Sequence, residues 1–234
     1  MSTGQSTADL RGLMQRALAE PSNADAAAFV LAGGESSRMG SDKALITLAG
    51  KPLIEHSLAI LRETGFSPTI AGARSRLESF ASVIEDRAHG HGPLAGVCAA
   101  LASTDAKWAV ILSIDLPFVP SSLIAYMLHR AEIDDSVAVA PSVSGFPQTF
   151  PVVVARAALP MIEQELEAGR SGCFAAIRSA SERLGRPMAV LPVEMLAQSG
   201  HVADERGLPP ALWFLNVNSP ADLARAERVL QPVA

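Results

Sequence analysis

Cysteine is scarce in this chain, which has only Cys98 and Cys173 among its 234 residues. Two cysteines are too few for a disulfide framework or for a metal site built from cysteine, so we expect each to be a small buried hydrophobic residue. Basic side chains are a minority too, because 19 of them against 24 acidic ones give a formal net charge of −5. Proteins that follow a nucleic-acid backbone usually carry a basic face, so this balance argues against nucleic acid as a partner.

Long apolar runs are also missing. No segment approaches the ~20 apolar residues that a membrane span needs. The opening sequence, MSTGQSTADLRGLMQRALAE, lacks the basic start and apolar stretch of a secretion signal. We therefore expect a cytoplasmic protein with no membrane partner. Because 49% of the residues are hydrophobic and 18% charged, the chain can bury one sizeable core, and its length fits one domain better than two.

The chain divides into a short polar start and one long region of alternating patterns. Residues 1–25 combine a polar segment, a short amphipathic helix and a linker with turn chemistry, and we interpret them as an appendage. Residues 26–234 form the predicted single domain, in which apolar runs typical of buried parallel strands alternate with stretches of helical period. Within it, the polar stretch Gln198–Pro210 predicts a mobile loop near the substrate side.

This alternation predicts an α/β fold with one open, mostly parallel sheet covered by helices on both faces. A first strand from Ala26 leads into a glycine loop, and a helix follows around residues 53–61. Later strands are expected at 69–71, 82–84, 108–114, 137–140, 150–154 and 188–193. Later helices are expected at 94–102, 121–131, 157–168, 173–184 and 220–230, and two serines are the cap candidates for the one that begins at 121.

The most informative segment follows the first predicted strand. It reads FVLAGGESSRMGSDK from Phe29 to Lys43. Gly33 and Gly34 let the backbone approach a ligand or adopt positive φ, and consecutive exposed N–H groups form a concave site for anions. Arg38 and Lys43 add charge that can neutralise a triphosphate. The segment predicts a phosphate-binding loop; the alternative is an ordinary glycine-containing turn with two solvated cations.

This loop differs from the two commonest nucleotide-binding patterns. The Gly-Lys-Ser/Thr ending of a P-loop is absent, and adjacent glycines replace the spaced glycines of Gly-x-Gly-x-x-Gly. The missing spacing argues against a nicotinamide-dependent oxidoreductase on a similar sheet.

The loop resembles the signature of the MobA-type molybdenum cofactor guanylyltransferases, which belong to a larger nucleotidyltransferase group that includes sugar-phosphate and isoprenoid cytidylyltransferases. The resemblance rests on LAGG (31–34), RMG (38–40) and GKPL (50–53), and continues through IED (84–86), GPLAG (92–96), IDLPFVP (114–120) and NVNSPADL (216–223). Only residues 1–25 and 198–210 lie outside it. It implies a Rossmann-like nucleotidyltransferase fold. It also implies catalytic roles for Arg38 and Lys43 and nucleotide binding by Leu31, Ala32, Gly33, Gly34 and Lys43.

Asp115 is the candidate metal ligand. It follows the apolar run 108–114, so we expect it at the carboxyl end of a central strand, where open α/β sheets place their ligand crevice. Mg²⁺ prefers oxygen ligands and commonly takes one or two protein carboxylates, with water and phosphate oxygens completing its shell. The alternative is a turn or helix-capping aspartate before Pro117. The resemblance assigns the equivalent aspartate to Mg²⁺, and so implies that Asp115 is a catalytic, nucleotide-binding and metal-binding residue.

Asp86 is the candidate for recognising the base. A buried carboxylate can accept two hydrogen bonds from the N1–H and 2-amino groups of guanine, a donor pattern that adenine lacks. The resemblance links the equivalent aspartate to the guanine nucleotide, whereas a surface Glu-Asp pair is the ordinary interpretation. The family's strand-two asparagine has no clear counterpart, because this chain has AGA at 71–73. In relatives, LAGG with GPLAG accompanies GTP and LAAG accompanies CTP; this chain carries the GTP pair.

Asn216 and Asn218 are candidates for the acceptor side of the site. They alternate along a strand-like stretch, so both amides are expected on one face, where they could bind the pterin or its phosphate. The alternative is that they cap the helix beginning at Pro220. The resemblance favours the pterin.

These residues and the resemblance predict transfer of GMP from GTP to the phosphate of molybdopterin or molybdenum-molybdopterin, with Mg²⁺ as cofactor and pyrophosphate released. Such chemistry needs alignment and charge neutralisation more than a covalent nucleophile. Two alternatives stay open. The same fold could use CTP or another phosphate acceptor, or the chain could be a non-catalytic GTP-binding module that delivers the cofactor to a molybdoenzyme or to cofactor-delivery proteins.

Overall fold

The computed structural model describes residues 25–33, 42–72, 77–85 and 92–231. Three predicted site residues, Gly34, Arg38 and Asp86, lie outside these ranges, as does the predicted appendage apart from Asp25. Within the described ranges, the helices lack the length and apolar character that crossing a membrane requires.

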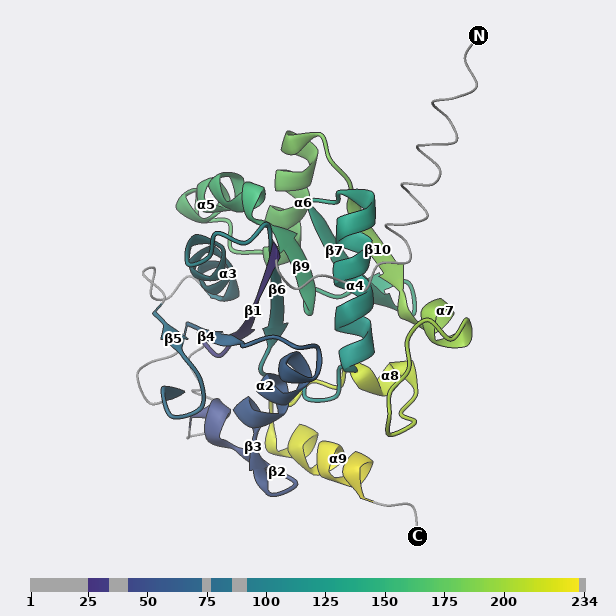
Figure 1. Ribbon diagram of the computed structural model, residues 1–234. Coiled ribbons are helices and arrows are strands. Elements are labelled where there is room, and N and C mark those ends of the chain that lie inside the picture. The colour runs from purple at the N-terminus through teal and green to yellow at the C-terminus, as the bar shows by residue number, and fades with distance from the viewer. Residues whose placement is uncertain (1–24, 34–41, 73–76, 86–91, 232–234) are drawn as a thin grey trace.

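A single large sheet forms the centre of the fold (Figure 1). Its strands run in the order β10-β7-β9-β6-β1-β4-β5, and β8 pairs with β7. Their bounds are β1 (Ala26–Leu31), β4 (Thr69–Ala71), β5 (Val83–Ile84), β6 (Trp108–Ser113), β7 (Ala138–Val143), β8 (Phe146–Pro147), β9 (Val152–Ala155) and β10 (Met188–Pro192). The pairs β1–β4, β1–β6, β4–β5 and β7–β10 are parallel, which confirms the mostly parallel sheet.

β9 is an exception within the sheet, because it lies between β6 and β7 and runs antiparallel to both. Reversing one inner strand still leaves β6 and β7 parallel to each other. The carboxyl ends of β1, β4, β6 and β7 therefore share one edge of the sheet.

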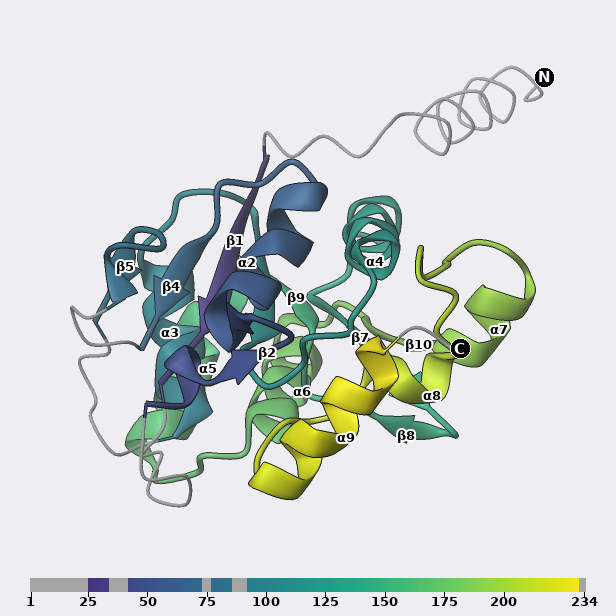
Figure 2. The same ribbon diagram turned by 90° about the horizontal axis from the view of Figure 1, so that it is seen from below.

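Helices cover both faces of the sheet, as the sequence predicts (Figure 2). Buried residues of β1 and β6 such as Val30 and Val110 pack with α2 and α4, whereas Phe29 and Ile111 point to the other face and pack with α3, α5 and α6. The helices are α2 (Leu53–Glu63), α3 (Pro93–Ala102), α4 (Ser121–Asp134), α5 (Leu159–Glu167), α6 (Cys173–Leu184), α7 (Val193–Gln198), α8 (Pro210–Trp213) and α9 (Pro220–Leu230). Strands buried on both faces explain the continuous apolar runs.

Short elements around the sheet were not predicted from the sequence. A two-stranded antiparallel hairpin joins β2 (Thr47–Leu48) to β3 (Lys51–Pro52), and single 3₁₀ turns occupy η2 (Lys43–Leu45) and η4 (Arg156–Ala158). The serine caps expected for α4 are wrong, because its N-cap residue is Pro120 and makes no side-chain cap. Ser122 instead donates a hydrogen bond from Oγ to the carbonyl of Ala203 at 2.6 Å.

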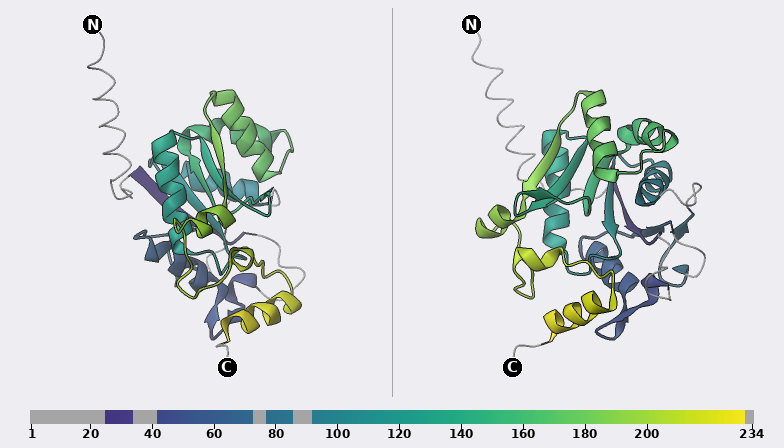
Figure 3. Two further views of the ribbon diagram at one scale, coloured as in Figure 1. Left: turned by 90° about the vertical axis from the view of Figure 1, so that its right-hand side faces the viewer. Right: turned by 180° about the vertical axis from the view of Figure 1, so that it is seen from behind.

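The segment between α7 and α8 is anchored, which corrects the prediction of a mobile loop. Val202 is buried, and the ring of His201 stacks on Tyr126 of α4 with 5.6 Å between ring centroids. The Arg206 guanidinium pairs with Asp204 at 2.6 Å and donates to the carbonyl of Phe118 at 3.2 Å. Figure 3 shows α7 and α8 with this segment beside α4. The polar composition of the stretch concealed these contacts.

Candidate active site at the carboxyl edge of the sheet

Three side chains from distant parts of the sequence meet at one point. The Lys43 ammonium donates a hydrogen bond to Oδ1 of Asn218, across a separation of 175 residues. The same Nζ atom lies 3.6 Å from Oδ2 of Asp115. The side chains of Lys43 and Asp115 are 21% and 22% exposed, so a ligand can reach both. The sequence predicted each residue as part of a site, and the structure brings them together.

Backbone hydrogen bonds fix Asp115 at the end of β6. The amide of Ile114 donates to the carbonyl of Leu31 at 3.1 Å, which extends the β1–β6 pairing up to the aspartate. The amide of Val217 donates to the carbonyl of Asp115 at 3.0 Å. The segment before α9 is therefore attached directly to Asp115, two residues after the end of β6. In Figure 1, α9 and the β2–β3 hairpin lie beyond the carboxyl ends of β1 and β6.

Lys43 is held by its own short turn. It begins η2, and the carboxylate of Asp42 caps this turn by accepting a hydrogen bond from the Ala44 amide at 3.1 Å. Ala44 is buried against the core that α2 shares with β1. A buried residue and a cap therefore fix the backbone that carries the lysine, while its long side chain extends to Asp115 and Asn218.

Gly33 and Gly72 come into close backbone contact where β1 and β4 end. The amide of Ala32 donates to the carbonyl of Ala71 at 3.0 Å, which continues the strand pairing. A Cβ atom added to Gly33 would lie 2.8 Å from the carbonyl oxygen of Gly72, closer than folded proteins allow. Gly72 itself has φ of +77°, a value that favours glycine. Glycine at both positions therefore has a packing reason, because it lets the ends of the two strands approach this closely.

The segment from 215 to 218 presents alternate residues to solvent, although it is not a strand. Asn216 and Asn218 are exposed and Val217 between them is buried, as the predicted alternation requires. Asn216 donates from Nδ2 to the carbonyl of Phe214 at 3.5 Å. The side chain that caps α9 is Ser219, so the capping alternative for the two asparagines is wrong. Their predicted contact with the pterin stays a prediction.

The residues that cap α9 are the part of this site that sequence reasoning missed. Ser219 Oγ accepts a hydrogen bond from the Asp222 amide at 3.2 Å and donates to Asp222 Oδ2 at 2.7 Å. The same carboxylate oxygen accepts from the Asn218 amide at 3.1 Å. The Ser219 hydroxyl and the Asn218 amide together hold the pKa of Asp222 below its usual range. The signal was present in the string Ser-Pro-Ala-Asp, which is a serine followed three residues later by an acid.

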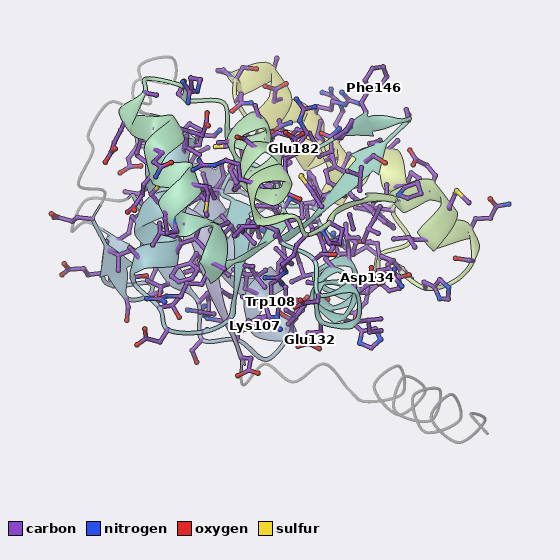
Figure 4. The ribbon with its side chains drawn as sticks, turned by 90° about the horizontal axis from the view of Figure 1, so that it is seen from above. Lys107, Trp108, Glu132, Asp134, Phe146 and Glu182 are labelled. Atoms are coloured by element: carbon purple, nitrogen blue, oxygen red, sulfur yellow. The ribbon has the colours of Figure 1, made fainter. Side chains whose placement is uncertain are left out.

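A second lysine and aspartate pair lies at the opposite end of β6. Lys107 Nζ is 3.1 Å from Oδ1 of Asp135. The same nitrogen lies 5.1 Å from the ring centroid of Trp108, and Figure 4 labels both Lys107 and Trp108. A hydrogen bond from Lys107 lowers the pKa of Asp135. Both charged side chains of this pair are more than half exposed. Because the pair precedes β6 while Asp115 follows it, the two pairs mark opposite edges of the sheet.

Of the predicted nucleotide-binding residues, the structure gathers Leu31, Ala32, Gly33, Lys43 and Asp115 at one edge, joined by Asn218 from the predicted acceptor side. No cluster of three or more His, Cys, Asp or Glu side chains suited to a metal occurs in the part of the chain that the structure describes.

Comparison with known proteins identifies relatives of this chain. Residues 28–187, more than half of the chain, match the model of the MobA-like NTP transferase domain. A relative from Haloferax mediterranei, named "Probable molybdenum cofactor guanylyltransferase", is 32% identical over 84% of this chain and 90% of its own. A relative of the same name from Bacillus anthracis is 28% identical over 87% of this chain and 96% of its own.

Among solved structures, molybdopterin-guanine dinucleotide biosynthesis protein A from Archaeoglobus fulgidus superposes with a TM-score of 0.69 and 26% identity, covering 86% of this chain and 97% of that one. The matched family region contains Gly33, Lys43 and Asp115, and the longer alignments extend beyond it. The chain therefore belongs to the MobA-like NTP transferase family and is a nucleotidyltransferase.

Proposed function

We propose that this enzyme transfers GMP from GTP to the phosphate of molybdopterin, or of molybdenum-molybdopterin, and releases pyrophosphate. The names of the Haloferax and Archaeoglobus relatives support guanylyl transfer to a molybdopterin acceptor. The observation that carries the proposal is the meeting of Lys43, Asp115 and Asn218 at the edge of the sheet where Gly33 follows β1. A cation, a carboxylate and bare backbone at the carboxyl edge of a parallel sheet are suited to a nucleoside triphosphate.

The proposed reaction is a displacement at the α-phosphorus of GTP. An oxygen of the acceptor phosphate forms a bond to that phosphorus, the bond to the bridging oxygen of the β-phosphate breaks, and pyrophosphate leaves with the electron pair. The attacking phosphate is already anionic, so no general base is required. Lys43 stabilises the charge that develops on the α-phosphoryl group and on the departing pyrophosphate, and the glycine turn fixes the triphosphate.

The residues at this edge suit Mg²⁺. Asp115 offers carboxylate oxygens, the ligand type that Mg²⁺ prefers, and its partly exposed side chain leaves room for water and phosphate oxygens. Asp115 would hold the ion, and no second protein carboxylate is required. When bound, Mg²⁺ would neutralise phosphate charge and help align the triphosphate. Arg38 and Asp86 stay proposed for charge stabilisation and for guanine recognition.

Pyrophosphate release from each of the four nucleoside triphosphates, with and without molybdopterin and Mg²⁺, tests the proposal. We expect release with GTP only when both the acceptor and Mg²⁺ are present. Turnover with CTP instead would indicate a cytosine dinucleotide product. Tight GTP binding without any release would indicate a module for cofactor delivery, the alternative outside catalysis.

The variant Lys43→Ala tests the central residue. Removing a group that stabilises transition-state charge costs about 10²–10³-fold in kcat, whereas a partly exposed cation contributes little to folding. We therefore expect a large fall in kcat with nearly unchanged Tm. Lys107→Ala is the matched control, because it removes the lysine of the ion pair at the opposite edge of the sheet. Similar kcat in the two variants would contradict the assignment.

A further inference from the structure

Helix α9 connects to the site through its first turn. The backbone of residues 218–222 is closed by three hydrogen bonds, of which two end on the same carboxylate oxygen of Asp222. One of those two comes from the backbone amide of Asn218, whose side chain accepts from Lys43. A continuous chain of hydrogen bonds therefore runs from Asp222 through Asn218 to Lys43.

The lysine needs such support, because its side chain is long and only partly buried. A flexible four-carbon stem with a single charge at its end has many conformations, and ordering it costs free energy. The carboxylate of Asp115 at 3.6 Å offers a charge without a close hydrogen bond. The Asn218 side-chain oxygen supplies the close hydrogen bond, which it accepts from the Lys43 ammonium. The position of the Asn218 side chain depends in turn on its backbone, which donates a hydrogen bond to the carboxylate of Asp222.

We propose that Asp222 is a positioning residue for nucleotidyl transfer, acting through Asn218 to hold the ammonium of Lys43 toward the phosphates. The proposal rests on the catalytic role proposed for Lys43. It gives Asn218 a second task besides the predicted contact with the acceptor. It also explains why a helix outside the matched region 28–187 belongs to the site.

The variant Asp222→Ala tests this proposal in the full-length enzyme with GTP and molybdopterin. Small displacements of a catalytic group are costly, so we expect kcat to fall about tenfold or more, with the KM for molybdopterin nearly unchanged. Asp222→Asn should retain most of the activity, because its amide oxygen can accept the same two hydrogen bonds. A rise in the KM for molybdopterin at constant kcat would overturn the proposal.

Ala226→Gly is the control for a merely structural role. Ala226 is fully buried in the middle of α9, one turn after Asp222, and its methyl group makes none of the hydrogen bonds of the cap, so glycine there weakens the helix without removing a capping group. We expect its Tm to fall with that of Asp222→Ala while its kcat stays near the wild-type value. Loss of kcat in Ala226→Gly equal to that in Asp222→Ala would overturn the positioning role.

A double variant shows whether the effect passes through Lys43. If it does, Lys43→Ala combined with Asp222→Ala should be no slower than Lys43→Ala alone. Multiplied losses would mean that Asp222 acts independently of the lysine, and would overturn this proposal while leaving the proposed function intact. Full activity in Lys43→Ala alone would overturn both.

Discussion

Replacing Gly33 with alanine tests the close contact between the ends of β1 and β4. The added Cβ would lie 2.8 Å from the carbonyl oxygen of Gly72 and 3.2 Å from its Cα. Both are backbone atoms, and they cannot turn aside as the end of a side chain can. The two strands are paired up to Leu31 and Ala71, immediately before this point. One strand end must therefore move by several tenths of an ångström.

The expected cost follows from overpacking, which typically destabilises by about 1–3 kcal/mol. In a domain of this size, each kcal/mol lowers Tm by about 2–4 °C, so thermal unfolding followed by circular dichroism should detect the change. The displaced segment leads directly into the glycine loop, so we expect kcat to fall about tenfold or more.

Gly169→Ala separates loss of stability from loss of site geometry. Gly169 follows α5 and has φ of +74°, with no atom within 4 Å of an added Cβ. Alanine there costs about 1–2 kcal/mol of backbone strain but leaves β1 and β4 in place. We expect a similar fall in Tm with unchanged kcat. Wild-type Tm and kcat in Gly33→Ala would refute the argument that this contact shapes the site.

Three further predictions concern other parts of the molecule. The pKa of Asp222 is lowered by its hydrogen bonds, so the charged carboxylate stabilises the fold at neutral pH, and this effect is lost as pH falls from about 4 through the lowered pKa. The Tm difference between wild type and Asp222→Asn should therefore be present near pH 7 and shrink steadily below about pH 4; a difference that stays constant or grows on acidification would contradict this direction. Burial raises the pKa of the Cys173 thiol to about 12, so iodoacetamide should label Cys173 slowly in the native protein and rapidly after denaturation, as peptide mass spectrometry can show; rapid native labelling would contradict its burial. Trypsin should cleave after Arg206 slowly in the wild type and faster in Asp204→Ala, because Asp204 anchors that guanidinium; equal rates would mean that the segment is not held there.

Elements with strong local signals could be predicted from the sequence alone. The bounds predicted for β4, α6 and α9 match those of the structure. The apolar run before Asp115 predicted a strand that ends at the ligand edge, and β6 ends two residues before the aspartate. Local patterns were enough to predict these elements, because apolar runs, helical periodicity and the positions of prolines can be recognised within a few neighbouring residues.

Features that depend on distant partners were not predictable in the same way. A strand buried on both faces reads the same in either direction, so the residues of β9 could not reveal its antiparallel course. The two serines that begin α4 looked like caps, but Ser122 finds its partner at Ala203, 81 residues away. The sequence predicted that Lys43 binds the nucleotide and that Asn218 binds the pterin acceptor. Their contact with each other became visible only in the fold.

A crystal structure with GTP and Mn²⁺ in place of Mg²⁺ would show whether the nucleotide and the metal bind at the carboxyl edge of the sheet. We expect the triphosphate to lie beside Gly33 with its α-phosphate near Lys43, and the anomalous signal of Mn²⁺ to lie at the carboxylate of Asp115. Nucleotide density at another edge of the sheet, or a metal peak away from Asp115, would contradict the account.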